Sequence, residues 1–265
     1  MPRPVTVTYH VLPTPAATAR AAAQLFSDTA VRAATARGIA RIAISGGTTP
    51  KSMFALLADP AEPFLDQVPW DRIELFWVDE RCVPPDNIES NYRMTNEALL
   101  SKVPLPAKRV YRMEGELVPE VAAARYESVI RNAFKLEGAE TPTFDLVLLG
   151  MGDDGHTASL FPHTEALNEM SRIVVPNHVL QKDTWRITLT WPVINQGREV
   201  AFLIEGKGKA QVLHDVFLGP YQPETYPSQI IRPMSGQLTL LLDAAAAAKL
   251  PAPKNSDSTG TLELK

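Results

Sequence analysis

Residues 144–162, FDLVLLGMGDDGHTASLFP, combine a short apolar run with a cluster of glycines, aspartates and a histidine. The run Phe144–Leu149 lies between Pro142 and Gly150, and its length and composition predict a buried strand. The polar cluster follows at once and therefore lies at the carboxyl end of that strand. In open parallel sheets, ligands bind beyond that end. The stretch predicts an α/β fold with a site near His156.

Short apolar runs alternate with helical patterns along most of the chain. Predicted strands cover residues 5–9, 41–45, 73–78, 144–149, 172–176, 185–191, 199–206 and 237–243. Predicted helices cover residues 14–37, 51–58, 90–100, 119–138 and 207–219. Strands interleaved with helices in this way predict a layered α/β fold with a mainly parallel sheet flanked by helices. Right-handed crossovers then bring the strand-terminal loops together along one edge.

The composition limits the class of protein. The chain has 265 residues, 45% hydrophobic and 21% charged, and this length suits one α/β domain, predicted over residues 1–250. The polar, turn-rich segment 251–265 is predicted to be a flexible tail. A net charge of −4 argues against nonspecific nucleic-acid binding, although a local basic pocket is compatible with it.

The sequence indicates neither a membrane span nor a disulfide. No apolar stretch reaches the roughly 18 residues that a spanning helix needs. The segment MPRPVTVTYH lacks the apolar core of a signal peptide. Cys82 is the one cysteine, so no intramolecular disulfide can form, and we expect a cytoplasmic protein. The oligomeric state is left open, and a monomer is compatible with the sequence.

The segment SGGTTPKS, residues 45–52, leaves a predicted strand and enters a helix. Gly46 and Gly47 let the backbone approach a ligand, and Pro50 suits the first helical turn. The N–H groups at such a helix start form a natural phosphate site. The spacing matches neither the Walker loop nor G-x-G-x-x-G. Taken alone, the segment is equally well interpreted as an ordinary tight turn.

Two other strand ends carry charged side chains. The triplet DER, residues 79–81, follows an apolar run, and Arg81 can hold a phosphate or carboxylate in a fork. A surface ion pair is the alternative interpretation of this triplet. EGKGK, residues 205–209, places Lys207 and Lys209 at a helix start. Cations there oppose the helix dipole, so they need either an anion or exposure to solvent.

The loop GMGDDGH has the most specific pattern. Asp154 precedes His156 by two residues, and a carboxylate there can orient the imidazole for general-base chemistry. A metal is the second interpretation, but one histidine and two adjacent acids make a poor ligand set without distant partners. A solvated turn histidine is the third, and the flanking glycines and the strand end argue against it.

Taken together, these segments resemble the 6-phosphogluconolactonase family. The resemblance runs in order through RIAISGGTTPKSMF, FWVDERCVPPDNIESNYRM, FDLVLLGMGDDGHTASLFP, EGKGKAQVL and YPSQIIRP, over most of residues 40–235. The family implies a modified Rossmann-type α/β fold shared with sugar-phosphate isomerases and deaminases. It also implies hydrolysis of 6-phospho-D-glucono-1,5-lactone to 6-phospho-D-gluconate in the oxidative pentose phosphate pathway, with neither metal nor organic cofactor.

The resemblance also implies roles for individual residues. His156 would take a proton from the attacking water, and Asp154 would orient His156. Arg81 would lie near the phosphate or donate to the oxyanion of the tetrahedral intermediate. Arg186 matches another family position in the substrate site. The phosphate would be held by Ser45, Gly46, Gly47, Thr48 and Lys209.

Two other functions fit the same fold. Glucosamine-6-phosphate deaminases have a similar loop but carry a glutamate five residues after the histidine, where this chain has Phe161, and a tyrosine in place of Arg81. Without that glutamate the proton relay of a deaminase is incomplete, which favours lactone hydrolysis. A non-catalytic sugar-phosphate sensor would need the phosphate site but not the pair of His156 and Asp154.

Overall fold

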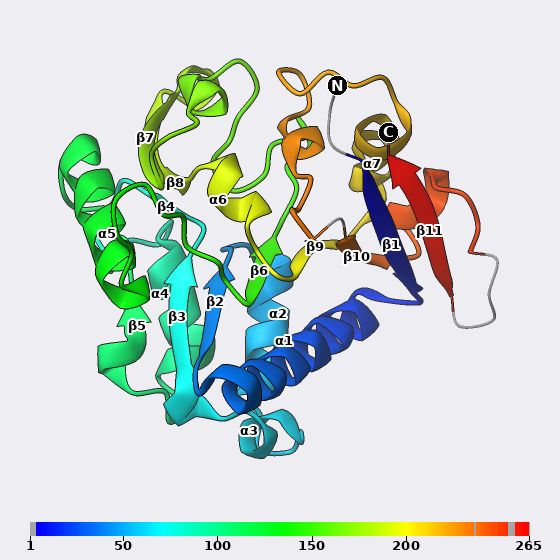
Figure 1. The fold of residues 1–265 in the computed structure, drawn as a ribbon. Helices are drawn as coiled ribbons and strands as arrows, with labels where there is room; N and C mark the ends of the chain where they lie inside the picture. Colours follow the sequence, from blue (N-terminus) through cyan, green and yellow to red (C-terminus); the bar gives the residue numbers. More distant parts are fainter. Residues whose placement is uncertain (1–3, 236, 254–257, 265) are drawn as a thin grey trace.

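The computed structural model describes residues 4–235, 237–253 and 258–264, and its main feature is an eight-stranded sheet with the order β11-β1-β10-β9-β6-β2-β3-β5 (Figure 1). Neighbouring strands are parallel, except that β11 runs antiparallel to β1. This confirms the predicted α/β fold with a mainly parallel sheet. The strands are β1 (Val5–Leu12), β2 (Ala40–Ile44), β3 (Ile73–Trp77), β5 (Val110–Tyr111), β6 (Leu146–Leu149), β9 (Val200–Ile204), β10 (Gln237–Asp243) and β11 (Thr259–Leu264).

A second, three-stranded sheet is antiparallel and was not foreseen. It consists of β4 (Asp79–Arg81), β8 (Thr184–Leu189) and β7 (Val174–Val179), in that order. The DER triplet is therefore a short strand and not a loop. The turn Leu180–Lys182 between β7 and β8 is too short for a parallel crossover, which needs a dozen or more residues. These two strands consequently pair as a hairpin beside the main sheet.

Helices flank the main sheet (Figure 1). The α-helices are α1 (Pro15–Arg37), α2 (Thr48–Leu57), α3 (Phe64–Gln67), α4 (Asn91–Thr95), α5 (Pro119–Phe134), α6 (Trp191–Asn195) and α7 (Ala210–Leu218). A π-helical turn, η2 (Asn96–Leu100), extends α4. The 3₁₀ turns are η1 (Trp70–Arg72), η3 (Ala107–Arg109), η4 (Glu165–Asn168), η5 (Leu180–Lys182), η6 (Lys207–Lys209), η7 (Pro227–Ile230) and η8 (Ala246–Lys249).

Local sequence signals explain where the helices begin and end. The side chain of Thr14 accepts a hydrogen bond from the backbone N–H of Ala17 and caps α1, which ends at Gly38 in the left-handed conformation. The helix predicted over residues 119–138 ends earlier, at Phe134, because Lys135 takes the left-handed conformation with φ of 55°. A non-glycine residue in that conformation serves as the C-terminal cap.

The central strands are buried along their whole length. All residues of β6 and β9 are buried, and both strands read as continuous apolar runs. Strands with this pattern belong to sheets that are covered on both faces. The burial explains why LVLL and VAFLI contain no polar residue, and why polar residues begin only where each strand ends.

The C-terminal segment differs from the expected flexible tail. Residues 259–264 form β11, which pairs with β1 along the edge of the sheet. The phenol of Tyr9 in β1 donates a hydrogen bond to the carbonyl of Pro251 at 2.8 Å. Gly260 is buried against Tyr9, and a Cβ atom at position 260 would lie 2.0 Å from Cζ of that ring. The polar composition of segment 251–265 suggested a flexible tail, but the exposed side chains of an edge strand are also polar.

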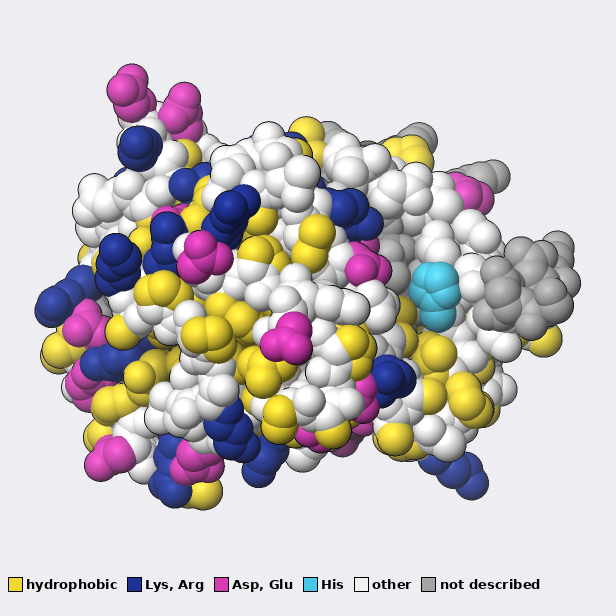
Figure 2. All heavy atoms as spheres, turned by 90° about the horizontal axis from the view of Figure 1, so that it is seen from below, with side chains coloured by type: hydrophobic (Ala, Val, Ile, Leu, Met, Phe, Trp, Pro, Cys, Tyr) yellow, Lys and Arg dark blue, Asp and Glu magenta, His cyan; other side chains and the backbone are white. Residues whose placement is uncertain are grey.

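The surface shows no segregation of charge on the face drawn in Figure 2, where basic and acidic side chains alternate among apolar ones. Such a mixture does not resemble the basic stripe of a nucleic-acid-binding surface. Among the described residues, no helix is long and apolar enough to cross a bilayer.

The contact between Gly260 and Tyr9 makes the order of β11 testable. We expect Gly260→Ala to lower the free energy of unfolding by about 1–3 kcal/mol, the usual effect of forcing an extra carbon into a packed site. Thr261→Ala is the matched control, because Thr261 lies in the same strand with its side chain exposed. Urea unfolding measures both variants. Equal stability of the two would mean that β11 does not pack on Tyr9.

Candidate active site

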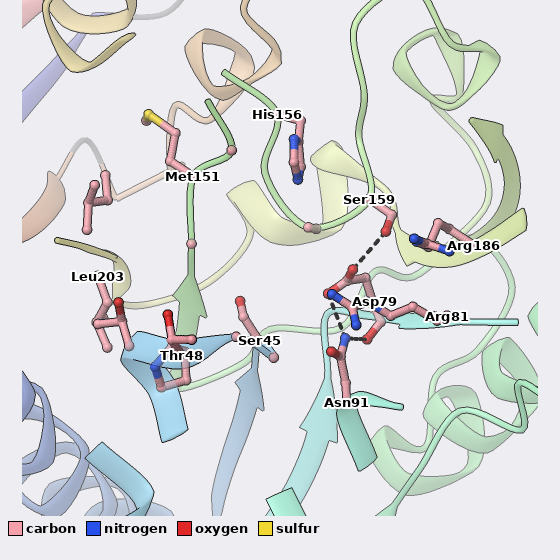
Figure 3. A pocket seen from close by; sticks show the side chains of 18 of the residues that line it. Ser45, Thr48, Asp79, Arg81, Asn91, Met151, His156, Ser159, Arg186 and Leu203 are labelled. Atoms are coloured by element: carbon pink, nitrogen blue, oxygen red, sulfur yellow. Dashed lines mark hydrogen bonds between the residues drawn. The ribbon is translucent and has the colours of Figure 1, made fainter. Parts of the chain in front are cut away.

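The loops that follow β2, β6 and β9 line one cavity of about 240 Å³, together with β4 and β8 (Figure 3). Strands β9, β6, β2 and β3 are neighbours in the parallel sheet, so their carboxyl ends lie side by side. Every site residue predicted from the sequence lines this cavity except Asp154, which contacts His156. The lining includes Ser45, Gly46, Gly47, Thr48, Thr49, Asp79, Arg81, Asn91, His156, Ser159, Phe161, Lys182, Arg186, Glu205 and Lys209.

The imidazole of His156 is held by Asp154. The distance between Nδ1 of His156 and Oδ1 of Asp154 is 2.5 Å, and the same carboxylate oxygen accepts the backbone N–H of His156. Partial burial opposes ionisation of Asp154, but the hydrogen bond and the charge of His156 outweigh it and lower the pKa of Asp154 to about 2. An ionised carboxylate only accepts, so the N–H at Nδ1 of His156 donates in this bond, and Nε2 is not engaged by Asp154.

Phe161 fixes the plane of the same imidazole. The two rings stack with centroids 3.9 Å apart and an interplanar angle of 22°. Phe161 is buried, and Nζ of Lys182 lies 5.0 Å from the centroid of its ring. One face of His156 is therefore covered by an aromatic ring while its edge is bonded to Asp154. The imidazole has little freedom to rotate away from the cavity.

The glycines of this loop are required by space. A Cβ atom at Gly152 would lie 2.0 Å from Nδ1 of His156 and 2.6 Å from Oδ1 of Asp154. Gly155 has a φ of 75°, which side-chain-bearing residues rarely adopt. The turn is closed by the N–H of Gly152, which donates to the carbonyl of His156 at 2.9 Å. The spacing of GMGDDGH thus allows the carboxylate to fold back onto the histidine.

The SGG segment brings the start of α2 to the cavity. Gly47 has a φ of 116°, and no side chain caps the N–H groups of the first turn of α2. Gly46 lies so close to Asn91 that a Cβ atom would be 1.8 Å from Oδ1 of Asn91. Ser45 is nearly buried, and its hydroxyl donates to the carbonyl of Leu148 in β6 at 2.6 Å. Ser45 thus joins two strand ends, while the N–H groups of α2 remain available to a ligand.

The middle residue of the DER triplet is structural. Glu80 is buried, and its carboxylate accepts from the backbone N–H groups of Arg81, Asn91 and Tyr92, each at 2.8 Å, and from the hydroxyl of Ser90. Burial raises the pKa of Glu80, although these N–H groups oppose the shift. Because side chains alternate along a strand, Glu80 points away from the cavity while its two neighbours line it.

Arg81 and Arg186 form a pair of cations at one end of the cavity. They are direct neighbours across the antiparallel pair of β4 and β8, and they approach the cavity from the same side (Figure 3). Arg81 donates to the carbonyl of Glu89, and Arg186 donates to Thr184 and to the carbonyl of Trp185. Burial and the charge of Arg81 lower the pKa of Arg186. Among the described residues, no carboxylate lies at ion-pair distance from either guanidinium.

Lys209 stands in a different electrostatic setting. Its Nζ atom forms an ion pair with Asp153 at 2.5 Å. Close by in the lining, Oε2 of Glu205 accepts from the hydroxyl of Thr49 at 3.0 Å, whereas Oε1 is buried without a hydrogen-bond partner among the described residues. Burial raises the pKa of Glu205. Lys209 is therefore already paired with a carboxylate outside the lining, and Glu205 adds a carboxyl group to the lining near it.

The polar residues of the cavity that were not selected from the sequence include Asp79, Asn91 and Ser159. The carboxylate of Asp79 accepts the hydroxyl of Ser159 at 2.7 Å, and the side-chain amide of Asn91 donates to the carbonyl of Asp79 at 2.9 Å. All three are buried. These residues belong to the segments DER, SNYRM and HTASLFP. Asp79 and Ser159 are 80 positions apart, so no local sequence pattern indicates that they form a hydrogen bond.

A wider groove of about 1030 Å³ lies along β7 and β8. Its lining includes the rings of His178 and Trp185, whose centroids are 4.8 Å apart. The groove is lined by neither the glycine-rich loops nor His156, so the smaller cavity is the candidate active site. Within the part of the chain that the structure describes, no group of three His, Cys, Asp or Glu residues is placed to hold a metal ion.

A sequence profile for the family described as "Glucosamine-6-phosphate isomerases/6-phosphogluconolactonase" matches residues 13–240. The chain belongs to this family. One curated relative is the 6-phosphogluconolactonase of Nostoc sp., which is 43% identical over 225 residues, 84% of this chain and 88% of the relative. Another is the 6-phosphogluconolactonase of Synechocystis sp., 42% identical over 216 residues, 81% of this chain and 86% of the relative.

Solved structures support the same relationship. The 6-phosphogluconolactonase from Trypanosoma cruzi superposes with a TM-score of 0.79 at 31% identity, over 94% of this chain and 97% of that one. The enzyme from Thermotoga maritima gives 0.75 at 28% identity, over 89% and 99%. A monomeric glucosamine-6-phosphate deaminase gives 0.75 over 91% and 99%, but at 19% identity this shows a shared fold alone.

The contact at Gly152 gives a test of the loop geometry. We expect Gly152→Ala to remain folded but to separate His156 from Asp154, because the new Cβ atom would overlap both side chains. Gly208→Ala is the control, since a Cβ atom there meets nothing within 4 Å. The NMR titration of His156 reports the separation as a shift in its midpoint. An unchanged midpoint in Gly152→Ala would contradict the geometry described here.

Proposed function

We propose that the protein is a 6-phosphogluconolactonase, which hydrolyses 6-phospho-D-glucono-1,5-lactone to 6-phospho-D-gluconate. The observation that carries this proposal is His156, oriented by Asp154 and Phe161, in a cavity that also contains two arginines. Within the described part of the chain these arginines have no carboxylate at ion-pair distance. Hydrolysis of a neutral lactone that carries a phosphate requires a base that activates water and cations that bind the phosphate. The names of the Nostoc and Synechocystis relatives support the same substrate class.

In this proposal His156 is the general base. Nε2 takes a proton from a water molecule as that water attacks the lactone carbonyl carbon. The positive charge that develops on the imidazole is stabilised by Asp154, which a pKa of about 2 keeps ionised in the neutral range. The bond between the carbonyl carbon and the ring oxygen then breaks, and the proton on His156 passes to that leaving oxygen, which becomes a hydroxyl. No metal or organic cofactor is needed for these steps, and their absence from the reaction stays a prediction.

The charges favour a revised position for the phosphate. The sequence suggested the SGG segment with Lys209, but Lys209 already pairs with the exposed Asp153, and Glu205 adds a carboxyl group to the lining at that end. At the other end Arg81 and Arg186 repel each other, and a dianion between them would relieve this repulsion. We therefore place the phosphate at the two arginines. The lactone carbonyl then lies towards the N–H groups of α2, which can stabilise the oxyanion.

Phe161 distinguishes this site from that of a deaminase. Its ring stacks on His156 at the position where the resemblance places the relay glutamate of the deaminases. An aromatic ring cannot transfer a proton, so the relay for opening and deaminating an amino sugar is incomplete. A sugar-phosphate sensor, the non-catalytic alternative, would not need the oriented imidazole. A cytoplasmic location remains a prediction from the sequence, which leaves the oligomeric state open.

The test of the function uses two substrates. The protein should hydrolyse freshly generated 6-phosphogluconolactone and release no ammonia from glucosamine 6-phosphate. His156→Ala should lower kcat roughly 100- to 10,000-fold, the usual contribution of a positioned base, without loss of thermal stability. Ammonia release by the unmodified protein at a comparable rate would overturn the assignment. Near-normal kcat in folded His156→Ala would remove the general-base role alone.

A second test locates the phosphate. Arg81→Ala and Arg186→Ala should each raise KM roughly tenfold to a hundredfold, since a charge-assisted contact contributes about 1.5–3 kcal/mol. Lys209→Ala should affect kcat more than KM. Arg20→Ala is the control, because Arg20 is paired with Glu62 on the surface. The opposite pattern, with KM raised by Lys209→Ala and unchanged by both arginine variants, would return the phosphate to the SGG segment.

A further inference from the structure

The segment 222–229, called the strap here, lies between α7 and β10 and contains the first half of YPSQIIRP. In Figure 1 the orange segment after α7 passes beside the green loop that follows β6. The strap contributes no residue to the lining of the candidate active site. It lies against residues 150–163, called the catalytic loop here because they carry His156.

The strap contacts the catalytic loop at both ends of the segment 155–163. The N–H of Ser228 donates to the carbonyl of Gly155 at 2.9 Å, and the N–H of His163 donates to the carbonyl of Glu224 at 3.1 Å. Between them, Tyr226 packs on Gly155 so closely that a Cβ atom at Gly155 would lie 2.9 Å from Cδ1 of Tyr226. The bracketed segment carries His156 and Phe161. The strap thus holds both rings of the stacked pair from outside.

Gln229 fastens the strap to α7. Its side chain is buried, and Oε1 accepts the N–H of Gln222 at 2.6 Å. Nε2 lies within hydrogen-bond distance of the carbonyls of Pro220 at 2.8 Å and of Asp215 and Val216, both at 3.2 Å. The last two carbonyls belong to the final turn of α7, where helix carbonyls lack partners within the helix. One amide therefore fixes the ends of the strap and the end of the helix together.

We propose that Tyr226 and Gln229 are positioning residues for His156. Tyr226 prevents the loop around Gly155 from moving outward, and Gln229 keeps Tyr226 in place. The ordering of His156 against Asp154 and Phe161 then depends on a segment that never touches the substrate. This inference rests on the proposed role of His156 as general base, and it extends that role to two residues outside the cavity.

The first experiment compares Tyr226→Ala with Tyr226→Phe. The contact on Gly155 is made by Cδ1, Cα and Cβ of Tyr226, so phenylalanine preserves it and alanine removes its closest atom, Cδ1. Tyr226→Ala should lower kcat roughly tenfold to a hundredfold, the scale of a small misplacement of a catalytic group, with KM within about twofold of the unmodified protein. Tyr226→Phe should restore the unmodified kcat.

The NMR titration of the His156 imidazole is a readout that does not depend on activity. Asp154 on its own loop contacts the ring, Lys182 lies across Phe161, and the same cavity is lined by Asp79, Arg81, Arg186, Glu205 and Lys209. Loosening the loop weakens the contact with Asp154, so the titration midpoint in Tyr226→Ala should shift in the same direction as in Asp154→Asn. Tyr226→Phe should leave the midpoint unchanged.

Gln229→Glu provides an independent variant. The carboxylate still accepts from Gln222 but cannot donate to the carbonyls at the end of α7, so kcat and the titration midpoint should change in the same direction as in Tyr226→Ala. Ser228→Ala is its control, because the hydroxyl of Ser228 has no partner among the described residues and the backbone N–H is kept.

The outcomes separate the inference from the proposed function. Folded Tyr226→Ala and Gln229→Glu with an unmodified kcat and an unmodified midpoint would overturn the positioning role. If Tyr226→Ala does not fold, Tyr226→Leu replaces it with a smaller loss of packing. If the unmodified protein does not hydrolyse the lactone, the proposed function fails, whereas a shifted midpoint in the two variants would still support the positioning of His156 by the strap.

Discussion

The parallel pairing of β9, β6, β2 and β3 is the constraint on which the site depends. Parallel strands in register end at the same edge, so four segments distant in sequence must leave the sheet beside one another. The hydroxyl of Ser45 reinforces this edge by donating to the carbonyl of Leu148 across the strand ends. The polar residues of the site begin where the hydrogen bonding of the sheet stops, because only there does the backbone need other partners.

The site combines rigid positioning with an uneven distribution of charge. Asp154 and Phe161 fix His156, and the carboxylate of Glu80 fixes the start of α4, which brings Asn91 to the cavity. Among the described residues, Arg81 and Arg186 instead have no carboxylate at ion-pair distance, and burial and the charge of Arg81 lower the pKa of Arg186. Such uncompensated charge in an otherwise well-satisfied site is typical of a place reserved for a ligand.

The sequence predicts most of this fold because its signals are local. Thr14 and Gly38 mark the ends of α1, and the apolar run before Gly150 marks β6. The antiparallel sheet was not predicted because an apolar strand has the same sequence pattern in a parallel and in an antiparallel sheet. Only the short turn at Leu180–Lys182 indicates that β7 and β8 pair antiparallel. In the site, the pair of His156 and Asp154 is local and was predicted. The partnership of Asp79 with Ser159 arises only when the chain folds.

The position of β1 has a consequence for the order in which the chain can fold. This strand precedes all other described strands in the sequence, yet its neighbours in the sheet, β10 and β11, follow all the others. The hydrogen-bonding edges of β1 cannot be paired as in the sheet until β10 and β11 have been translated. Contacts between such distant segments are slow to form and expose edges to aggregation in the meantime. The edges of β1 are therefore open to pairing with other chains until β10 and β11 emerge from the ribosome.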